Sequence, residues 1–100
     1  MPKGYEIMEA FMKSSTNAQN RITLHKEHVY FGGMNLTYQL VLERGTELHS
    51  FCIRVIKGSE IREVDVGTDL SRALSWYEAI VRGTVTPCTL EEVIRELQYA

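Results

Sequence analysis

Two cysteines and three histidines are the residues of this 100-residue chain whose side chains most readily do chemistry. Cys52 and Cys88 are far apart in the sequence, with no C-x-x-C spacing and no histidine pair at the distances of a zinc finger. We therefore expect neither a metal site nor a disulfide framework. Two unpaired thiols are typical of a protein that works in the cytoplasm.

The histidines do not form an obvious ligand set. His25 and His28 are three residues apart in a segment that reads as a strand, so their side chains point to opposite faces. His49 is expected at the end of an apolar sheet face, where such a residue is commonly hydrogen-bonded to backbone at the margin of a core. No shared metal or acid–base role follows for these three residues.

One arrangement of chemical groups stays open as an alternative. Cys88 immediately precedes a predicted helix start at Thr89, where the positive helix end favours a thiolate. No histidine lies nearby in the sequence to act as its base. A small-molecule binder or enzyme would have to use the sheet end near His49, Tyr30 and Cys88, and would require these side chains to converge.

Motifs for cofactor binding or catalysis are absent from the sequence. Gly32-Gly33 falls in a predicted hairpin, and no G-x-G-x-x-G or Walker pattern follows a strand. No G-x-S-x-G or H-E-x-x-H pattern is present either. We expect no cofactor and no catalytic residue, which favours a small interaction or regulatory module over an enzyme.

The charge of the chain argues against nucleic acid as a partner. Lys plus Arg number 11 against 13 for Asp plus Glu, which gives a net charge of −2. The electrostatic attraction that drives non-specific nucleic-acid binding is therefore missing. Acidic residues at Glu6 and Glu9 interrupt the apolar part of the N-terminal stretch, and no apolar run has the length of a membrane span. A cytoplasmic protein without a membrane segment is expected.

Two regions differ in character. Residues 1–20 form an N-terminal segment in which a few apolar side chains fall at helical spacing before the polar run SSTNAQN. A short helix or a flexible segment is predicted there. Residues 21–100 are predicted to form a single α+β domain, because one chain of this length has room for one core.

Three turn signals organise the first part of that domain as four antiparallel strands. Gly32-Gly33 and Gly58-Ser59 read as two-residue hairpin loops, and residues 44–47 read as a four-residue loop. The resulting register pairs apolar residues on one face: Phe31 with Met34, Val29 with Leu36, Leu42 with His49, Leu36 with Val55, Ile53 with Val64 and Phe51 with Val66. A β-meander with one apolar face needs a cover.

Two helices are predicted to supply that cover. The segment TDLSRALSWYEAIVRG has an apolar stripe, an N-cap at Thr68 or Asp69 and a stop at Gly83. A second helix is predicted to begin at Thr89, with Glu92 completing a capping box. The expected architecture is a four-stranded antiparallel β-meander with one face covered by a C-terminal helical hairpin, in the order ββββαα.

Trp76 falls off the main stripe of the first of these helices and is the only tryptophan. Because interface hot spots favour tryptophan, an interaction surface formed by Trp76, Phe11 and Met12 is one hypothesis. Packing of Trp76 on the flank of the sheet is the other. If Trp76 belongs to an interaction surface, we expect a protein partner or a homodimer.

The C-terminal segment Val85-Thr86-Pro87-x-x-Leu90-x-Glu92-Val93 carries a family resemblance. Together with the Tyr38-x-Leu40 and Phe51-x-Ile53-x-Val55 strands, it resembles a small domain-of-unknown-function family of spore-forming Gram-positive bacteria whose members end in V-T-P-x-H-L-x-D-V. The resemblance covers residues 22–97. Thr89 stands where that family has histidine, and Glu92 where it has aspartate. It implies a single domain of this length and no particular activity.

Overall fold

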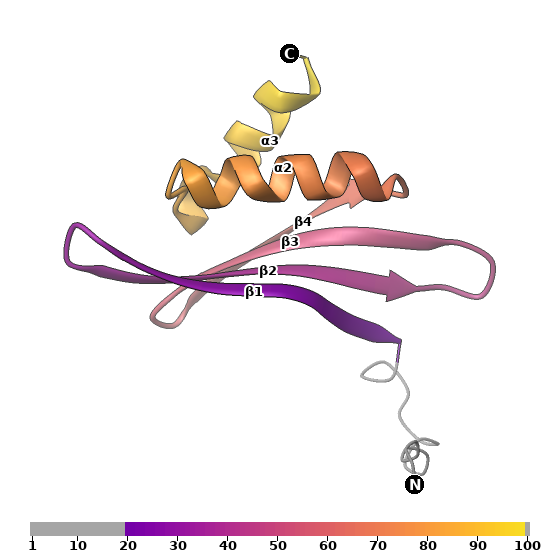
Figure 1. Cartoon of the computed structure of the whole chain (residues 1–100), viewed down its shortest axis with the longest axis horizontal. Coiled ribbons are helices and arrows are strands. Elements are labelled where there is room, and N and C mark those ends of the chain that lie inside the picture. The colour runs from indigo at the N-terminus through magenta and orange to yellow at the C-terminus, as the bar shows by residue number, and fades with distance from the viewer. Residues whose placement is uncertain (1–19, 100) are drawn as a thin grey trace, which may run out of the picture.

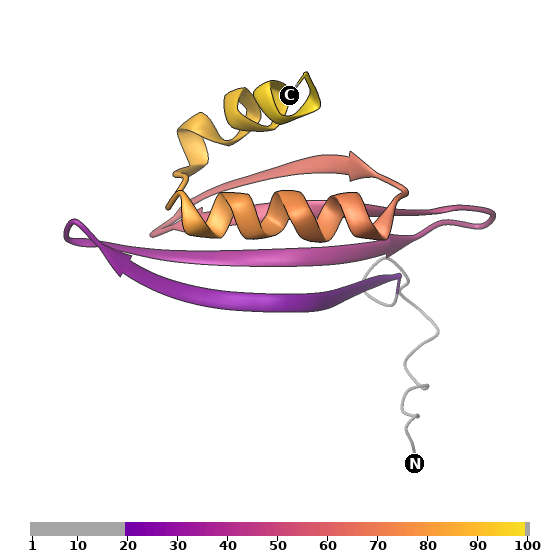
Figure 2. The same cartoon turned by 45° about the horizontal axis from the view of Figure 1, so that its top comes forward.

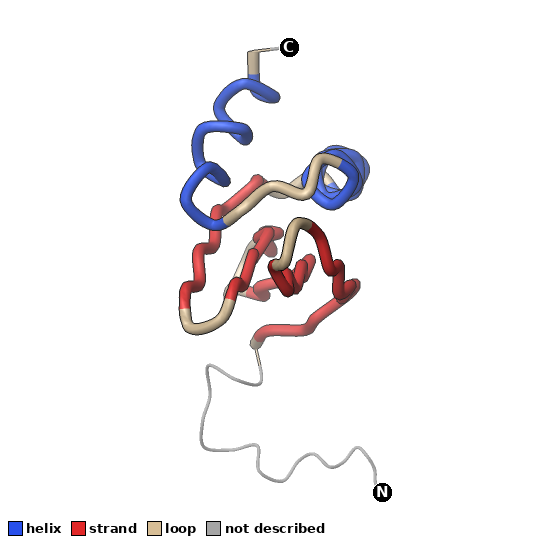
Figure 3. Tube along the Cα trace, turned by 90° about the vertical axis from the view of Figure 1, so that its left-hand side faces the viewer, coloured by secondary structure: helices blue, strands red, loops and turns tan. Residues whose placement is uncertain are grey.

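The computed structural model describes residues 20–99. The element order is β1 (Arg21–Phe31), β2 (Met34–Arg44), β3 (His49–Lys57), β4 (Glu60–Gly67), α2 (Leu70–Arg82), the 3₁₀ turn η2 (Pro87–Thr89) and α3 (Leu90–Gln98). The strands form one antiparallel sheet in the order β1-β2-β3-β4, and both helices lie on the same side of it (Figures 1 and 3). The predicted ββββαα architecture is confirmed. The predicted N-terminal segment lies outside the described residues, apart from Asn20.

The β1–β2 hairpin has the predicted register. Phe31 pairs with Met34 and Val29 pairs with Leu36. Gly32 and Gly33 form the connecting turn, with φ values of 59° and 79°. These angles lie in the left-handed region that glycine enters without a steric penalty, as a two-residue hairpin of this hand requires.

The predicted register between β2 and β3 is wrong by two residues. Leu42 pairs with Phe51 instead of His49, and Leu36 pairs with Lys57 instead of Val55. The four-residue loop lies one residue further along the chain than predicted, at residues 45–48, so that Arg44 pairs with His49. Because side chains alternate with a period of two, this shift leaves every residue on its predicted face.

The β3–β4 hairpin has the predicted register up to a bulge. Ile53 pairs with Val64 as expected, whereas Phe51 pairs with Gly67 instead of Val66. The register shifts between Phe51 and Cys52, where one extra residue of β4 is inserted. Val66 is nevertheless buried, at 4% exposure.

The core fills the space between the helices and the sheet. It consists of the side chains on the helix side of β2, β3 and β4, together with the inner faces of the helices: Leu36, Tyr38, Leu40, Phe51, Ile53, Val55, Val66, Ala73, Tyr77, Ile80, Val85, Leu90 and Ile94. Two tyrosines place their hydroxyl groups inside this core. Tyr38 donates to the Val85 carbonyl at 3.0 Å, and Tyr77 donates to the Tyr38 carbonyl at 3.2 Å. Both hydroxyls are therefore satisfied, as buried polar groups require.

Both predicted ends of α2 form as expected, whereas the predicted cap of α3 does not form. The Asp69 carboxylate accepts the Arg72 N–H at 3.3 Å, and Gly83 is the C-cap of α2. Thr89 precedes α3 but makes no side-chain capping bond to the helix. Its hydroxyl instead donates to the Thr86 carbonyl at 3.3 Å within the 3₁₀ turn. The predicted capping box with Glu92 is therefore wrong.

The helices cover the sheet unevenly. α2 packs on β2, β3 and β4, and α3 packs on β4 and α2. β1 runs along the edge outside this helix layer (Figure 2). Within residues 20–99, no helix is long and apolar enough to cross a membrane.

Candidate functional site

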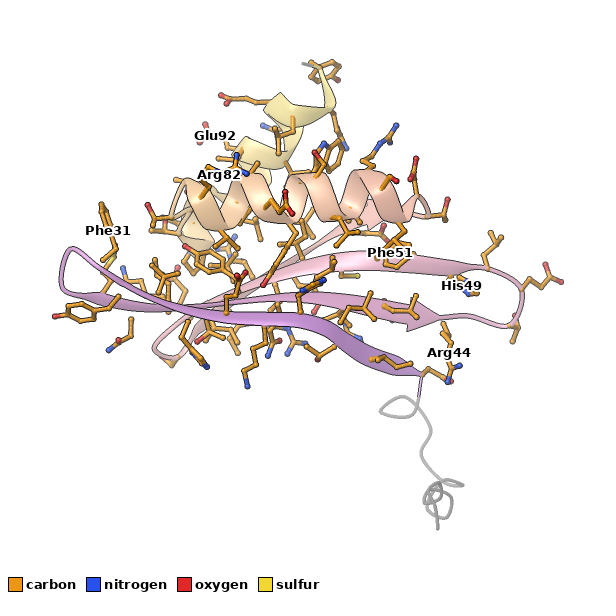
Figure 4. The ribbon with its side chains drawn as sticks, in the orientation of Figure 1. Phe31, Arg44, His49, Phe51, Arg82 and Glu92 are labelled. Carbon is orange, nitrogen blue, oxygen red and sulfur yellow. The ribbon has the colours of Figure 1, made fainter. Side chains whose placement is uncertain are left out.

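The sheet end around His49 contains a shallow depression. It has a volume of about 430 Å³ and is lined by Arg44, His49, Ser50 and Thr68, among others. Arg44 and His49 lie at this end of the sheet, far from Phe31 at the β1–β2 turn (Figure 4). Arg21 also lines the depression, but its guanidinium is bound to Glu63.

The structure does not bring Tyr30 and Cys88 to this depression. Tyr30 pairs with Asn35 and His49 pairs with Arg44, so nine residues of β2, roughly 30 Å of strand, separate the two positions. Cys88 is exposed in η2 and does not line the depression. The alternative site of His49, Tyr30 and Cys88 is therefore not assembled.

The face of the sheet opposite the helices carries a network of ion pairs. The Glu63 carboxylate binds the guanidinium of Arg21 through one oxygen and that of Arg54, at 3.0 Å, through the other. Desolvation raises the pKa of Glu63, but the hydrogen bonds from the two arginines outweigh it and hold that pKa below its ordinary value. Beneath this network Val41 and Cys52 are buried, at 4% and 3% exposure. This face of the sheet is thus charged on the outside but contains two buried, largely apolar positions.

Three potential metal ligands meet in this network. Ligand atoms of Glu43, Cys52 and Glu63 lie within 4.8 Å of one another. Burial, followed by the nearby carboxylates, raises the pKa of the Cys52 thiol to about 12, and both oxygens of Glu63 are engaged by arginines. A metal ion would have to displace both guanidinium groups and deprotonate this thiol. Glu43, Cys52 and Glu63 therefore belong to a structural network of ion pairs and not to a metal site.

The predicted interaction surface is described only at Trp76. This side chain is half-buried and packs against the core, and the Arg72 guanidinium carbon lies 5.4 Å from its ring centroid. Phe11 and Met12 lie outside the described residues. Within residues 20–99, Trp76 is thus a flank of the core partly covered by an arginine.

The exposed apolar side chains concentrate elsewhere, on β1. Eight large hydrophobic residues of residues 20–99 are exposed, and four of them belong to this strand: Ile22, Leu24, Tyr30 and Phe31. Tyr30 is 72% exposed and Phe31 is 55% exposed. Of the eleven residues of β1, only Arg21 and Val29 are even half-buried. We call the unpaired side of Arg21–Phe31, with its exposed side chains, the β1 edge.

The opposite edge of the sheet is much less suited to contact. β4 has eight residues, of which Glu60, Arg62, Glu63 and Asp65 are charged, and α3 packs against it. Charged side chains and a covering helix are the usual means by which proteins protect an edge strand. β1 carries fewer charges and is longer, and among residues 20–99 no helix packs along its outer side.

Sequence reasoning missed the β1 edge although a signal was present. In a meander the first and last strands are necessarily the two edges, and the first strand contains the exposed pair Tyr30-Phe31. Alternation of apolar residues identifies the face of a sheet that is buried, but it does not indicate how many of four strands two helices can cover.

Comparisons with known proteins do not assign this surface. No model of a known protein family matches the chain, no curated protein matches it significantly, and no solved structure matches its fold significantly. The function has to be argued from the surface itself.

Proposed function

We propose that this protein is a small protein-interaction module that makes its contact through the β1 edge. The observation that carries this proposal is that, within residues 20–99, half of the exposed large hydrophobic residues belong to one edge strand. A strand of this kind offers a row of unpaired backbone N–H and C=O groups to an added strand. Side chains on either side of that row supply the selectivity.

The surroundings of the β1 edge support a binding role. Tyr30 and Phe31 stand next to the β1–β2 turn, and aromatic side chains are enriched among the residues that dominate interface energies. The strand itself is firmly held, because all its residues except Leu24, at a bulge, pair with β2. A partner strand would therefore meet a preformed template.

The compartment that we propose is the cytoplasm. Both cysteines, Cys52 and Cys88, are free, and unpaired thiols are usual where the environment is reducing. This supports a cytoplasmic partner.

A capture experiment with matched variants tests the proposal. The tagged full chain is used to capture proteins from a lysate of the cells that express it, beside a Tyr30→Ala/Phe31→Ala variant and a Leu48→Ala/Tyr99→Ala control. Leu48 and Tyr99 are 72% and 84% exposed but lie outside β1. We expect the β1 variant to lose a specific partner about tenfold or more, since truncation of interface anchors has effects of this size.

The control variant should retain the same partner at the wild-type level. Equal retention by all three proteins, or an equal loss in both variants, would contradict a contact through the β1 edge. Circular dichroism of the variants establishes that a loss of partner does not come from a loss of fold.

A further inference from the structure

We propose that the partner of the β1 edge is a second copy of this chain, paired antiparallel through β1 with His28 of one copy opposite His28 of the other. This inference rests on the proposed function and names its partner. The two sheets would then join into one continuous eight-stranded sheet about a twofold axis through the paired His28 residues.

The backbone groups available for this pairing follow from the β1–β2 hairpin. Gly32-Gly33 is a two-residue loop flanked by the pair Phe31 and Met34. In such a hairpin the flanking residues exchange both backbone hydrogen bonds, and bonded and non-bonded pairs then alternate along the ladder. His25, Glu27, Val29 and Phe31 therefore bond to β2. Lys26, His28 and Tyr30 turn their N–H and C=O groups outward.

Symmetry allows only a few registers. Residues directly opposite each other in an antiparallel pair share a face, so a twofold axis normal to the sheet must pair one residue with its own copy. The regular part of β1 begins at His25, because a bulge lies between Thr23 and His25. The axis therefore falls at one of the residues inside His25–Phe31.

Charge and hydrogen bonding select one of these registers. An axis at Lys26 opposes two ammonium groups and extends the pairing into the bulge. An axis at Glu27 opposes two carboxylates, and like charges directly opposite are destabilising. An axis at Val29 or at Tyr30 leaves Lys26 without a bonded partner. Only an axis at His28 places Lys26, His28 and Tyr30 all in bonded pairs.

The same register covers the exposed aromatic side chains. Lys26 comes to lie opposite Tyr30 of the second copy, where its aliphatic stem and charge both complement the ring. On the helix side, His25 comes to lie opposite Phe31 of the second copy. α2 packs mainly on β2, β3 and β4 and meets β1 where the His25 ring lies 5.7 Å from the Tyr77 ring. Within residues 20–99, the outer side of β1 is the edge of the sheet, which leaves room for the added strand (Figure 2).

Lys26 and the bulge are features that proteins use to protect edge strands. Here Lys26 and the bulge disfavour the competing registers, and the segment His25–Phe31 stays available for pairing with an added strand. They therefore act on which pairing forms. In the His28 register neither the two Lys26 nor the two Glu27 side chains lie directly opposite each other, and Lys26 of each copy meets the Tyr30 ring of the other. β1 thus supplies both members of this cross-strand pair, which favours a second copy over an unrelated strand.

A charge-exchange experiment at His28 tests the dimer. His28 is exposed, and its Nδ1 lies 3.0 Å from the Thr37 hydroxyl on the surface, so its replacement costs little in folding. His28→Asp opposes two carboxylates across the axis, and His28→Lys opposes two ammonium groups. We expect each variant alone to be monomeric and an equimolar mixture of the two to dimerise, because unlike charges then meet.

Sedimentation velocity of the full chain gives the readout. The wild-type mass should rise with concentration from 11.5 kDa toward twice that value. The control variant His49→Asp, which replaces an exposed histidine at the far end of the sheet, should dimerise as the wild type does. The mixture of the His28 variants should reach the same mass, which also shows that both variants are folded.

Three results would overturn the inference. They are a wild-type chain that stays monomeric throughout, His28 variants that each dimerise normally, and a mixture that remains monomeric. A monomeric wild type that still captures another protein, in a manner dependent on Tyr30 and Phe31, would overturn the second copy as partner and leave the proposed function intact.

Discussion

At the scale of single residues, the stability of a Trp76→Ala variant distinguishes two roles of this side chain. A role in the core predicts a loss of stability, whereas a role in an interaction surface predicts almost none. Its ring is half-buried against the core. Truncation of a tryptophan in this position removes apolar contact area, so Trp76→Ala should lower the free energy of unfolding by about 2 kcal/mol, roughly half the loss at a fully buried aromatic position. Urea unfolding followed by circular dichroism measures this change.

Tyr99→Ala is the matched control for Trp76→Ala, because Tyr99 is also aromatic but is 84% exposed. Its stability should stay within about 0.5 kcal/mol of the wild type, as is usual for surface substitutions. A Trp76→Ala protein as stable as this control would mean that the indole is not part of the core, and would return Trp76 to the interaction surface.

The two cysteines should differ sharply in reactivity. Cys52 is 3% exposed, and burial together with Glu63, Asp65 and Glu43 raises the pKa of its thiol to about 12. Cys88 is exposed. Because the thiolate is the reacting species, iodoacetamide should modify Cys88 in the folded protein and Cys52 only after unfolding. Peptide mapping by mass spectrometry distinguishes the two, and early modification of Cys52 would contradict its burial.

The raised pKa of Cys52 also fixes the sign of a pH effect. The folded state keeps the neutral thiol up to a pH near 12, whereas the unfolded chain begins to ionise near its ordinary value of 9.0. The stabilisation from Cys52 is therefore complete below pH 9 and is lost as the pH rises toward 12. In a Cys52→Ala variant this part of the alkaline loss should be absent.

At the scale of elements, the sequence predicted faces more reliably than registers. The β2–β3 pairing differs from the prediction by two residues, yet every core residue of these strands keeps its face, because a shift of two restores the alternation. Turn glycines defined the β1–β2 and β3–β4 hairpins because only their backbone angles suit two-residue loops. The four-residue loop before His49 has no such constraint, and its ends could not be fixed.

The failure of the capping box has a local cause. Pro87 begins a 3₁₀ turn directly before α3, so Thr89 has φ −108° and ψ 0° instead of an extended conformation. Its hydroxyl is used within the turn, on Thr86. Sequence spacing alone does not reveal this competition.

The same limit applies to the candidate site of His49, Tyr30 and Cys88, whose members proved to lie in separate places only once the strand directions were known.

At the scale of the whole molecule, the two helices pack mainly on β2, β3 and β4, and β1 meets them at its inner margin, where the His25 ring lies 5.7 Å from that of Tyr77. β1 is not loosely attached, because every residue from Arg21 to Phe31 except Leu24, at the bulge, pairs with β2. The molecule thus combines a well-packed half, formed by β2, β3, β4 and the helices, with an open margin at β1. Such a division suits the interaction that we propose for the β1 edge.

Hydrogen exchange should reveal this division in the monomeric His28→Asp variant. Amides of β2 and β3, which have a strand on each side, should exchange most slowly. Within His25–Phe31, amides that bond to β2 should be protected, whereas those of Lys26, Tyr30 and the substituted position between them should exchange quickly, because they point outward. NMR resolves this alternation residue by residue.

In the wild-type protein at high concentration, the outward-facing amides of Lys26, His28 and Tyr30 should become protected while the amides already bonded to β2 change little. Protection that rises only at these alternate positions would be the mark of a strand added at the β1 edge. Equal exchange along β1 in the monomer would contradict the backbone directions on which the pairing depends, because every amide of the strand would then have the same environment.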